Sequence, residues 1–289
     1  MIPSRFPDLK PVGPEDGPLI RDFFSRFPPE ACEMTFANVF IWRECERPKY
    51  AVRDGHLCIL CSPTDEPAYF LQPAGEGDLA ATVEACLELN PRLSRITEPF
   101  AQRHGASHTV EPDPDNFDYV YASEDLAQLK GKKYDGKRNR IRKFERTTAW
   151  GYRNLGADTL DDCRALLEKW FNGKVLADES VGAEKAAILA ALNGLRDLDL
   201  TGGAITVEGK VEAFSIGEPL NADTAVIHIE IADQAFPGLA QLINREFVRR
   251  EWSRFAFINR EQDVGHPGLR RAKESYQPHH MVRKYTITR

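Results

Sequence analysis

The stretch GGAITVEGKVEAFSIGEPLNADTAVIHIEI, residues 202–231, decides the fold of this chain. It holds three short runs rich in β-branched residues, which is typical of consecutive strands. Gly209 lies between the first two runs and permits a tight turn there. In the third run, 224–231, isoleucines alternate with His228 and Glu230, and alternate side chains of a strand point to opposite faces. We therefore expect a sheet whose third strand carries two ionisable groups on one face.

Helical patterns surround these strands. Segments 159–171 and 181–195 precede them, and a helix at 237–252, a strand at 254–259, a helix at 267–276 and a strand at 282–288 follow. The N-terminal part of the chain, which we call the first pass, has elements in a similar order. It holds a helix at 31–44, a hairpin turning at Asp54-Gly55, a strand, a helix at 78–89, a strand, a short helix and a strand at 116–122. Strands and helices that alternate in this way predict an α/β (α+β) protein.

The order of elements in the second pass is that of GNAT acyltransferases, and the first pass repeats part of it. The sequence thus predicts tandem GNAT-like modules with mixed, mostly antiparallel sheets. We expect an N-terminal module at 1–125, a basic helical linker at 126–155 and a C-terminal module at 156–289. Because many functions share one fold, the site needs separate arguments.

Composition and the lack of long apolar runs exclude some classes of protein. The chain has 289 residues, of which 42% are hydrophobic and 28% charged. No apolar run approaches the roughly 20 residues of a membrane helix, and no export signal is evident. We therefore expect a cytoplasmic protein with reduced thiols. If it acts at a membrane, we expect it to bind there peripherally. Cys58 and Cys61 form a CxxC near His56, but no second ligand pair follows, which favours buried thiols over zinc.

Charge is concentrated in one segment. Lys130 to Arg146 holds nine basic residues against Asp135 and Glu145, a net charge of +7, while the rest of the chain carries −13. Such a block indicates an anionic partner or, alternatively, a helix that pairs with the acidic remainder of the chain. The candidate nucleic-acid contacts in this segment are Lys137, Arg138, Asn139, Arg142 and Lys143.

Glu230 is the first candidate catalytic residue. A central strand covered on both faces should be apolar throughout, so His228 and Glu230 on one face suggest that this face lines a cleft. Glu230 would then act as a general base toward an attacking amine. The alternative is a one-sided sheet with both side chains in solvent.

The loop 233–241, DQAFPGLAQ, is a candidate coenzyme A site. GNAT enzymes bind the pyrophosphate of coenzyme A on backbone amides before a helix, with the pattern Q/R-x-x-G-x-G/A. Gly238 and Ala240 match the end of this pattern, but Ala235 occupies the Gln/Arg position. The alternative is an ordinary helix start.

The richest stretch is 259–278, NREQDVGHPGLRRAKESYQP. Its candidate substrate-binding residues are Asn259, Glu261, Gly268, Arg270, Lys273 and Tyr276, with His228 from the strand at 224–231. Arg270 and Lys273 share a helix face and, with the helix N-terminus, would form an anion pocket. Asp263 is the second candidate catalytic residue, which would position or deprotonate an acceptor amine, or would only cap the helix. We expect Asp263, Arg270 and Lys273 to line one cleft, onto which Glu230 opens.

Three segments resemble a known family. INREQDVGHPGLRRAKESYQPHHMVRKY (258–285), GKKYDGKRNRIRKFER (131–146) and FANVFIWRE (36–44) resemble the phosphatidylglycerol lysyltransferase C-terminal domain family. The resemblance implies tandem GNAT-like modules, which are related to the Fem-type transferases, and an aminoacyl group moved from charged tRNA to a lipid head group. Matched positions are Arg138, Asn139 and Lys143 in the basic motif and Asp263, Gly268, Arg270, Lys273 and Tyr276 in the C-terminal motif. Unlike the lipid-modifying members, the chain shows no membrane-spanning region.

Three functions follow as hypotheses. The first is transfer of an aminoacyl group from aminoacyl-tRNA to an amine or hydroxyl acceptor, with charged tRNA and an anionic lipid head group as partners. It needs no cofactor or metal, because the ester is already activated. The second is a coenzyme A-dependent N-acyltransferase, which would use acyl-CoA. The third is a non-catalytic binding protein on the same fold. No GxSxG motif or P-loop is present, which disfavours hydrolase and nucleotide-phosphate chemistry.

Overall fold

The computed structural model describes residues 4–172 and 179–289. The chain divides into two compact units that are discontinuous in sequence. The first unit comprises 1–118, 262–267 and 281–289, and the second comprises 119–261 and 268–280. Contiguous modules were expected instead, and the segment 126–155, expected as a linker, lies within the second unit.

The first unit is built on one mixed sheet. In spatial order its strands are β1 (Lys10–Pro11), β2 (Lys49–Arg53), β3 (His56–Cys61), β4 (Tyr69–Phe70), β6 (Arg92–Thr97), β15 (Lys284–Thr288) and β7 (Thr109–Pro112), and β5 (Ala74–Gly75) pairs with β3. Its helices are α1 (Gly17–Arg26), α2 (Phe36–Ile41), α3 (Arg43–Glu46), α4 (Leu79–Leu89) and α5 (Glu98–His104), with 3-10 turns η1 (Pro14–Asp16) and η2 (Pro114–Asn116). Only β4 and β6 pair in parallel among the pairs described. Val83 and Leu87 of α4 pack against Phe70, Leu93 and Ile287 of the sheet, which forms a core for this unit.

Local sequence signals explain much of the first unit. The hairpin β2–β3 turns at Asp54 and Gly55, both with positive φ (48° and 84°), as the Asp-Gly pair predicts. The helix expected at 31–44 begins later, at Phe36, because the Thr35 side chain accepts a hydrogen bond from the Asn38 amide and caps it there. The Cys58 and Cys61 side chains are buried on β3, as the sequence favoured.

The second unit holds the stretch that decides the fold. Its sheet has the order β14 (His280–Val282), β8 (Asp118–Ala122), β13 (Phe257–Asn259), β12 (Thr224–Ala232), β11 (Lys210–Pro219), β10 (Thr201–Val207) and β9 (Trp150–Asn154). Strands β9 to β12 pair antiparallel, and β13 runs parallel to β12. Gly209 (φ 82°) turns β10 into β11, as expected.

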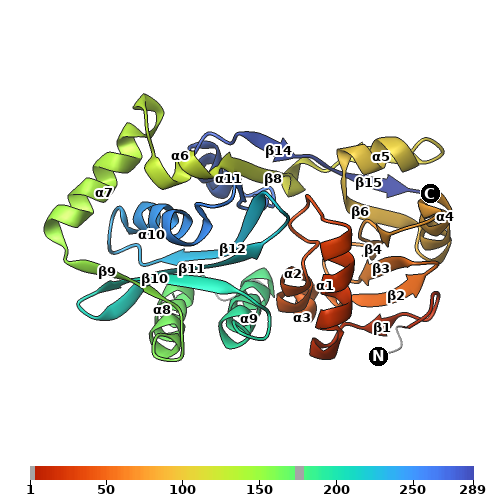
Figure 1. Cartoon of the computed structure of the whole chain (residues 1–289), viewed down its shortest axis with the longest axis horizontal. Helices are drawn as coiled ribbons and strands as arrows, with labels where there is room; N and C mark the ends of the chain where they lie inside the picture. Colours follow the sequence, from red (N-terminus) through yellow and green to blue (C-terminus); the bar gives the residue numbers. More distant parts are fainter. Residues whose placement is uncertain (1–3, 173–178) are drawn as a thin grey trace. The chain divides into compact units, whose positions relative to one another are not determined.

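Helices cover both faces of this second sheet. They are α6 (Ser123–Gln128), η3 (Lys132–Tyr134), α7 (Asp135–Thr147), α8 (Leu160–Asn172), α9 (Glu179–Asn193), α10 (Leu239–Phe247), a π-helical turn η4 (Val248–Trp252) and α11 (Pro267–Glu274). In Figure 1, α8 and α9 lie on one face of β10–β12 and α10 on the other. Buried Leu239, Leu242, Ile243 and Phe247 form the core face of α10, at helical spacing. Among residues 4–172 and 179–289, no helix is long and apolar enough to cross a bilayer.

Each sheet contains one strand that the sequence pattern had assigned to the other module. Of the segment expected as one C-terminal strand, 282–288, residues 284–288 form β15, which lies between β6 and β7 of the first sheet, whereas Val282 ends β14 of the second sheet. Conversely β8, expected in the N-terminal module, pairs with β13 of the second sheet. The fold class is as predicted, an α/β architecture with two mixed, mostly antiparallel sheets.

Candidate functional site

The third strand of the deciding stretch presents its ionisable side chains as predicted. Along β12, Ile227, Ile229 and Ile231 are buried, while His228 and Glu230 are intermediate in exposure. Neither polar side chain lies free in solvent, because each is held by residues of other elements. The strand therefore anchors two neighbouring polar clusters within the second unit.

The first cluster surrounds Glu230. Its Oε2 accepts a hydrogen bond from Asn244 Nδ2 of α10 at 2.9 Å, and its Oε1 accepts one from Arg260 Nη2 at 3.0 Å. The side chains of Glu230 and Arg260 are only 19% and 13% exposed. The Arg260 guanidinium carbon also lies 4.7 Å from the ring centroid of Tyr276 and 5.6 Å from that of Tyr121. A carboxylate, an amide and a guanidinium thus meet between aromatic rings.

This cluster has unused hydrogen-bonding capacity. Because only the amide nitrogen of Asn244 can donate to a carboxylate, its Oδ1 points elsewhere, and this buried oxygen has no hydrogen-bond partner among the described residues. The same holds for Nη1 of Arg260. A buried donor or acceptor without a partner costs stability, so native proteins rarely keep one without a reason. Here one buried acceptor and one buried donor lie on the two side chains that hold Glu230.

The second cluster holds His228 between two carboxylates. Nδ1 donates to Glu261 Oε1 at 2.7 Å and Nε2 donates to Glu218 Oε1 at 2.9 Å. Burial alone would lower the pKa of His228, but the hydrogen bonds to Glu218 and Glu261 outweigh it and raise the pKa from 6.5 to about 10. His228 is therefore a fixed imidazolium that joins β11, β12 and the end of β13.

The residues after β13 form a tightly bonded turn. Asn259 is buried and its Oδ1 accepts from the Glu261 amide at 2.8 Å. The buried Lys273 ammonium donates to the carbonyl oxygen of Glu261 at 3.0 Å and also to that of Arg260. Glu261 itself has a positive φ of 57°, which costs energy for a side chain of this kind. Lys273 thus holds the turn that positions Arg260.

The other residues predicted from this stretch lie on or beside α11. Tyr276 is buried, and its carbonyl oxygen accepts from the Tyr134 hydroxyl at 2.8 Å. Gly268 and Arg270 are half-buried on α11. Asp263 is buried in the first unit, where its Oδ1 accepts from the Gly265 amide at 2.9 Å in a turn just before α11. That Asp263, Arg270, Lys273 and Glu230 share one cleft stays a prediction.

Residues 135–147 of the basic region form α7, as predicted, and some cations of the region are paired with acids while others are not. Lys130, Lys133 and Arg138 form ion pairs with Glu124, Asp125 and Asp135, respectively. In contrast, other exposed side chains of α7 form no ion pair with any described residue; they are Arg140, Arg142, Lys143 and Arg146. Asn139 is exposed beside them. The alternative that the block is neutralised by the chain's own acids therefore holds for only part of it.

Lys137 differs from the other cations of α7. Its Nζ donates to the carbonyl oxygen and hydroxyl of Ser275, at 2.7 and 2.8 Å, and lies 4.0 Å from the Tyr276 ring centroid. Burial, followed by the guanidinium groups of Arg260 and Arg140, lowers the pKa of Lys137 to about 8. Two cationic side chains, Lys137 and Arg260, thus lie against the Tyr276 ring.

The loop proposed for coenzyme A is packed against α7. Gly238 has a φ of 103° and precedes α10, and a Cβ built on it would lie 2.5 Å from the Arg140 carbonyl oxygen. The glycine at this position is thus required by close approach of the α7 backbone. The contact gives Gly238 a packing role that needs no pyrophosphate.

A second match to the same pattern lies in the first unit. Gln72 to Gly77, QPAGEG, fits Q-x-x-G-x-G and precedes α4, and a scan of both passes for the pattern would have found it. The Gln72 side chain, however, accepts from the hydroxyl of Thr97 at 3.0 Å. A Cβ on Gly75 would lie 2.2 Å from the Gly55 carbonyl oxygen, and the Asp78 carboxylate already caps the helix. This match, too, is explained by packing and capping.

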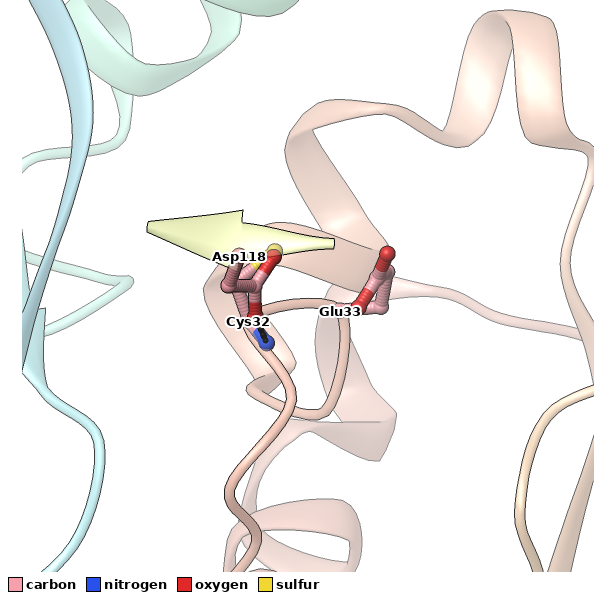
Figure 2. Close-up of side chains that lie close together, drawn as sticks. All are labelled: Cys32, Glu33 and Asp118. Carbon is pink, nitrogen blue, oxygen red and sulfur yellow. Dashed lines mark hydrogen bonds between the residues drawn. The ribbon is translucent and has the colours of Figure 1, made fainter. Parts of the chain in front are cut away.

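A buried charged cluster in the first unit was not anticipated from the sequence (Figure 2). Cys32 and Glu33 follow α1, and Asp118 begins β8; their ligand atoms lie within 4.8 Å of one another, as in a metal site. The Lys284 ammonium of β15, however, donates to Asp118 Oδ1 and Glu33 Oε2, each at 2.6 Å, and lies 3.6 Å from Cys32 Sγ. The chain itself supplies the cation here. No signal near Lys284 marks this role, because its partners are 166 and 251 residues away in the sequence.

Comparisons with known proteins agree with this architecture. A conserved protein of unknown function from Bacteroides thetaiotaomicron is similar over 97% of this chain and 98% of its own, with 31% identity and a TM-score of 0.90. L-PGS from Bacillus licheniformis is similar in fold, with 14% identity, coverage of 97% and 93%, and a TM-score of 0.67. No curated protein matches the chain in sequence. Residues 24–288 match the family described as phosphatidylglycerol lysyltransferase, C-terminal, and the chain belongs to that family.

Proposed function

We propose that this protein is an acyltransferase that moves an aminoacyl group from aminoacyl-tRNA to an amine or hydroxyl acceptor. The observation that carries the proposal is the row of exposed cations on α7 without acidic partners: Arg140, Arg142, Lys143 and Arg146. Like charges three or four residues apart weaken a helix by a few tenths of a kcal/mol. A phosphate backbone would relieve this repulsion and would be bound without regard to sequence.

The Glu230 cluster has the groups that acyl transfer requires. An aminoacyl ester is already activated, so the protein has to align the acceptor and stabilise the oxyanion that develops on the carbonyl. Arg260 Nη1 and Asn244 Oδ1 are a buried donor and a buried acceptor without a partner among the described residues. In this proposal the first stabilises the oxyanion and the second binds an N–H group. Glu230 holds both side chains in place and, in this proposal, orients them rather than acting as the base.

Two further observations concern the acceptor and the donor of the proposed reaction. The family name includes phosphatidylglycerol, whose head group is anionic and offers hydroxyl acceptors, and we propose such a head group as the acceptor class. A coenzyme A donor is less well supported, because the glycine of its expected loop packs against α7. A binding protein without activity would bind RNA but transfer nothing.

RNA binding over a series of salt concentrations tests the proposal. In the triple variant Arg142→Gln/Lys143→Gln/Arg146→Gln, each lost phosphate contact should lower the slope of log affinity against log salt by about 0.7–0.9. The matched control is Arg153→Gln/Arg164→Gln/Lys185→Gln, which removes three cations of the second unit that are paired with acids.

The control should retain wild-type affinity for charged tRNA. Equal losses in both triple variants would indicate a general charge effect instead of a site on α7. If the wild-type protein binds no tRNA at all, the proposed donor is wrong.

A further inference from the structure

The exposed cations of α7 that have no acidic partner lie in two rows along the helix. Arg140 and Lys143 form one row, and Arg142 and Arg146 form the other, because residues three or four positions apart share a face of a helix. With a rise of about 1.5 Å per residue, each row extends for about 5–6 Å. Asn139, which is also exposed, lies between the rows.

The same surface offers no ring on which an unpaired base could stack. Tyr134 and Phe144, which lie within the basic region, are buried. Trp150 is half-buried on β9, and no aromatic side chain is exposed among residues 4–172 and 181–289. Proteins that hold single-stranded nucleic acid combine a positively charged groove with aromatic rings on which the bases stack. The surface of α7 has the charge without the rings.

The acids of α7 do not neutralise the two rows. Asp135 is paired with Arg138, and Glu145 is paired with Arg245 of α10 at 2.7 Å. Gly136, at the start of the helix, has no described atom within 4 Å of a built Cβ, so a partner can approach the backbone closely there. The charge of both rows is thus available to a partner outside the chain.

We propose that α7 lies across the minor groove of double-stranded RNA, with one row of cations on each phosphate strand. The inference rests on the proposed function and specifies which part of the RNA is bound. A duplex presents a row of phosphates on each border of a groove, whereas a single strand presents one row. The minor groove of A-form RNA is wide and shallow and displays 2′-hydroxyls, with which the Asn139 amide can form hydrogen bonds. The minor groove of B-DNA is only about 6 Å wide, which is too narrow for a helix of about 10 Å diameter.

Equilibrium binding of three nucleic acids to the full chain tests the inference. They are an RNA hairpin duplex, a DNA duplex of the same sequence and an unstructured single-stranded RNA, all with the same number of phosphates. We expect the RNA duplex to bind at least about tenfold more tightly than either of the others, a difference of about 1.4 kcal/mol.

Two double variants test whether both rows are needed. Arg140→Gln/Lys143→Gln and Arg142→Gln/Arg146→Gln each leave a single row, so each should bind the RNA duplex no more tightly than the single-stranded RNA. Because all four side chains are exposed, we expect both variants to fold, and melting curves check this. If one variant is unfolded, the other decides.

A third variant and a control complete the series. Asn139→Ala should reduce the preference for the RNA duplex over the DNA duplex, since it removes the group that meets the 2′-hydroxyls. The matched control, Arg164→Gln/Lys185→Gln, removes two cations of α8 and α9 that are paired with acids, and it should keep both preferences.

The outcomes separate the two proposals. Single-stranded RNA or duplex DNA that binds as tightly as the RNA duplex overturns the present inference, while binding of charged tRNA keeps the proposed donor. A duplex preference that survives in both row variants overturns it as well. If vesicles of phosphatidylglycerol displace the RNA duplex at equal phosphate concentration, the rows bind a lipid surface and the inference is wrong. Absence of binding to any RNA, charged tRNA included, overturns both proposals.

Discussion

At the scale of single residues, the pKa and the structural role of a buried charged side chain depend on the groups with which it is paired. Lys284 is fully buried, and burial alone would lower its pKa; Asp118, Cys32 and Glu33 instead raise it above its usual value. Glu33 in turn has its pKa raised by burial, in spite of Lys284. A buried ion pair adds little net stability over an apolar pair, but removing one partner leaves an uncompensated charge. Lys284 is therefore structural, and its loss should be costly.

We predict that Lys284→Met destabilises the first unit by about 3–5 kcal/mol, because it removes the ammonium that pairs with both the Asp118 and the Glu33 carboxylate. Denaturant unfolding measures the change. The control is Arg283→Met, next in sequence, whose side chain is 59% exposed and which should cost less than about 0.5 kcal/mol. Similar unfolding midpoints for the two variants would contradict the assigned role of Lys284.

At the scale of elements, contact between α7 and α10 sets the conformation of the chain before α10. The Phe144 and Phe236 rings meet edge to face at 6.2 Å, and Gly238 lies against the Arg140 carbonyl oxygen. The exposed cations of α7 are thus presented by a helix whose apolar stripe, Ile141 and Phe144, is buried. Packing on one side and charge on the other explain why this helix is both basic and ordered.

Two glycine variants distinguish packing from helix propensity. Gly238→Ala should destabilise the second unit by at least about 1 kcal/mol, because φ is positive there and the added Cβ would lie 2.5 Å from a carbonyl oxygen. Gly136→Ala, in α7 with no described atom within 4 Å of the added Cβ, should instead stabilise it by up to about 1 kcal/mol. Thermal unfolding measures both. A neutral Gly238→Ala would mean that α7 does not press on this position.

At the scale of the whole molecule, the first sheet depends on a strand from the end of the chain. Strand β15, from the end of the chain, lies between β6 and β7 in the first sheet, and β8, from the middle of the chain, pairs with β13 in the second. The segment 118–282 contains every strand of the second sheet, whereas the first sheet needs strands from 10–112 and from 284–288. The first unit therefore cannot finish its sheet until the last residues are present.

We predict that deleting residues 284–289 removes protection from hydrogen exchange in β6 and β7, because β15 is their shared partner. Strands β10 to β12 should keep theirs, since their ladders involve no deleted residue. Deletion of Arg289 alone is the control and should change little. If β6 remains protected in the longer deletion, β15 is not required for the first sheet.

The sequence by itself determined the features that depend on near neighbours. The alternation in 224–231 predicted which side chains of β12 share a face, the Asp54-Gly55 pair predicted the hairpin turn, and charge counting found α7. The family resemblance of the basic and C-terminal segments also proved correct. Such features follow from strand and helix periodicity and from backbone sterics, which act over a few residues.

Only the tertiary structure decided the contacts between distant residues. It showed that Asn244 and Arg260 donate hydrogen bonds to Glu230 and that Lys284 pairs with acids far away in the sequence. It also showed that β15 belongs to the first sheet. It also gave Gly238 a packing role where the pattern had suggested a coenzyme site. The physical reason is that desolvation and charge pairing depend on what the whole fold brings within a few ångströms, and no periodicity in the sequence records it.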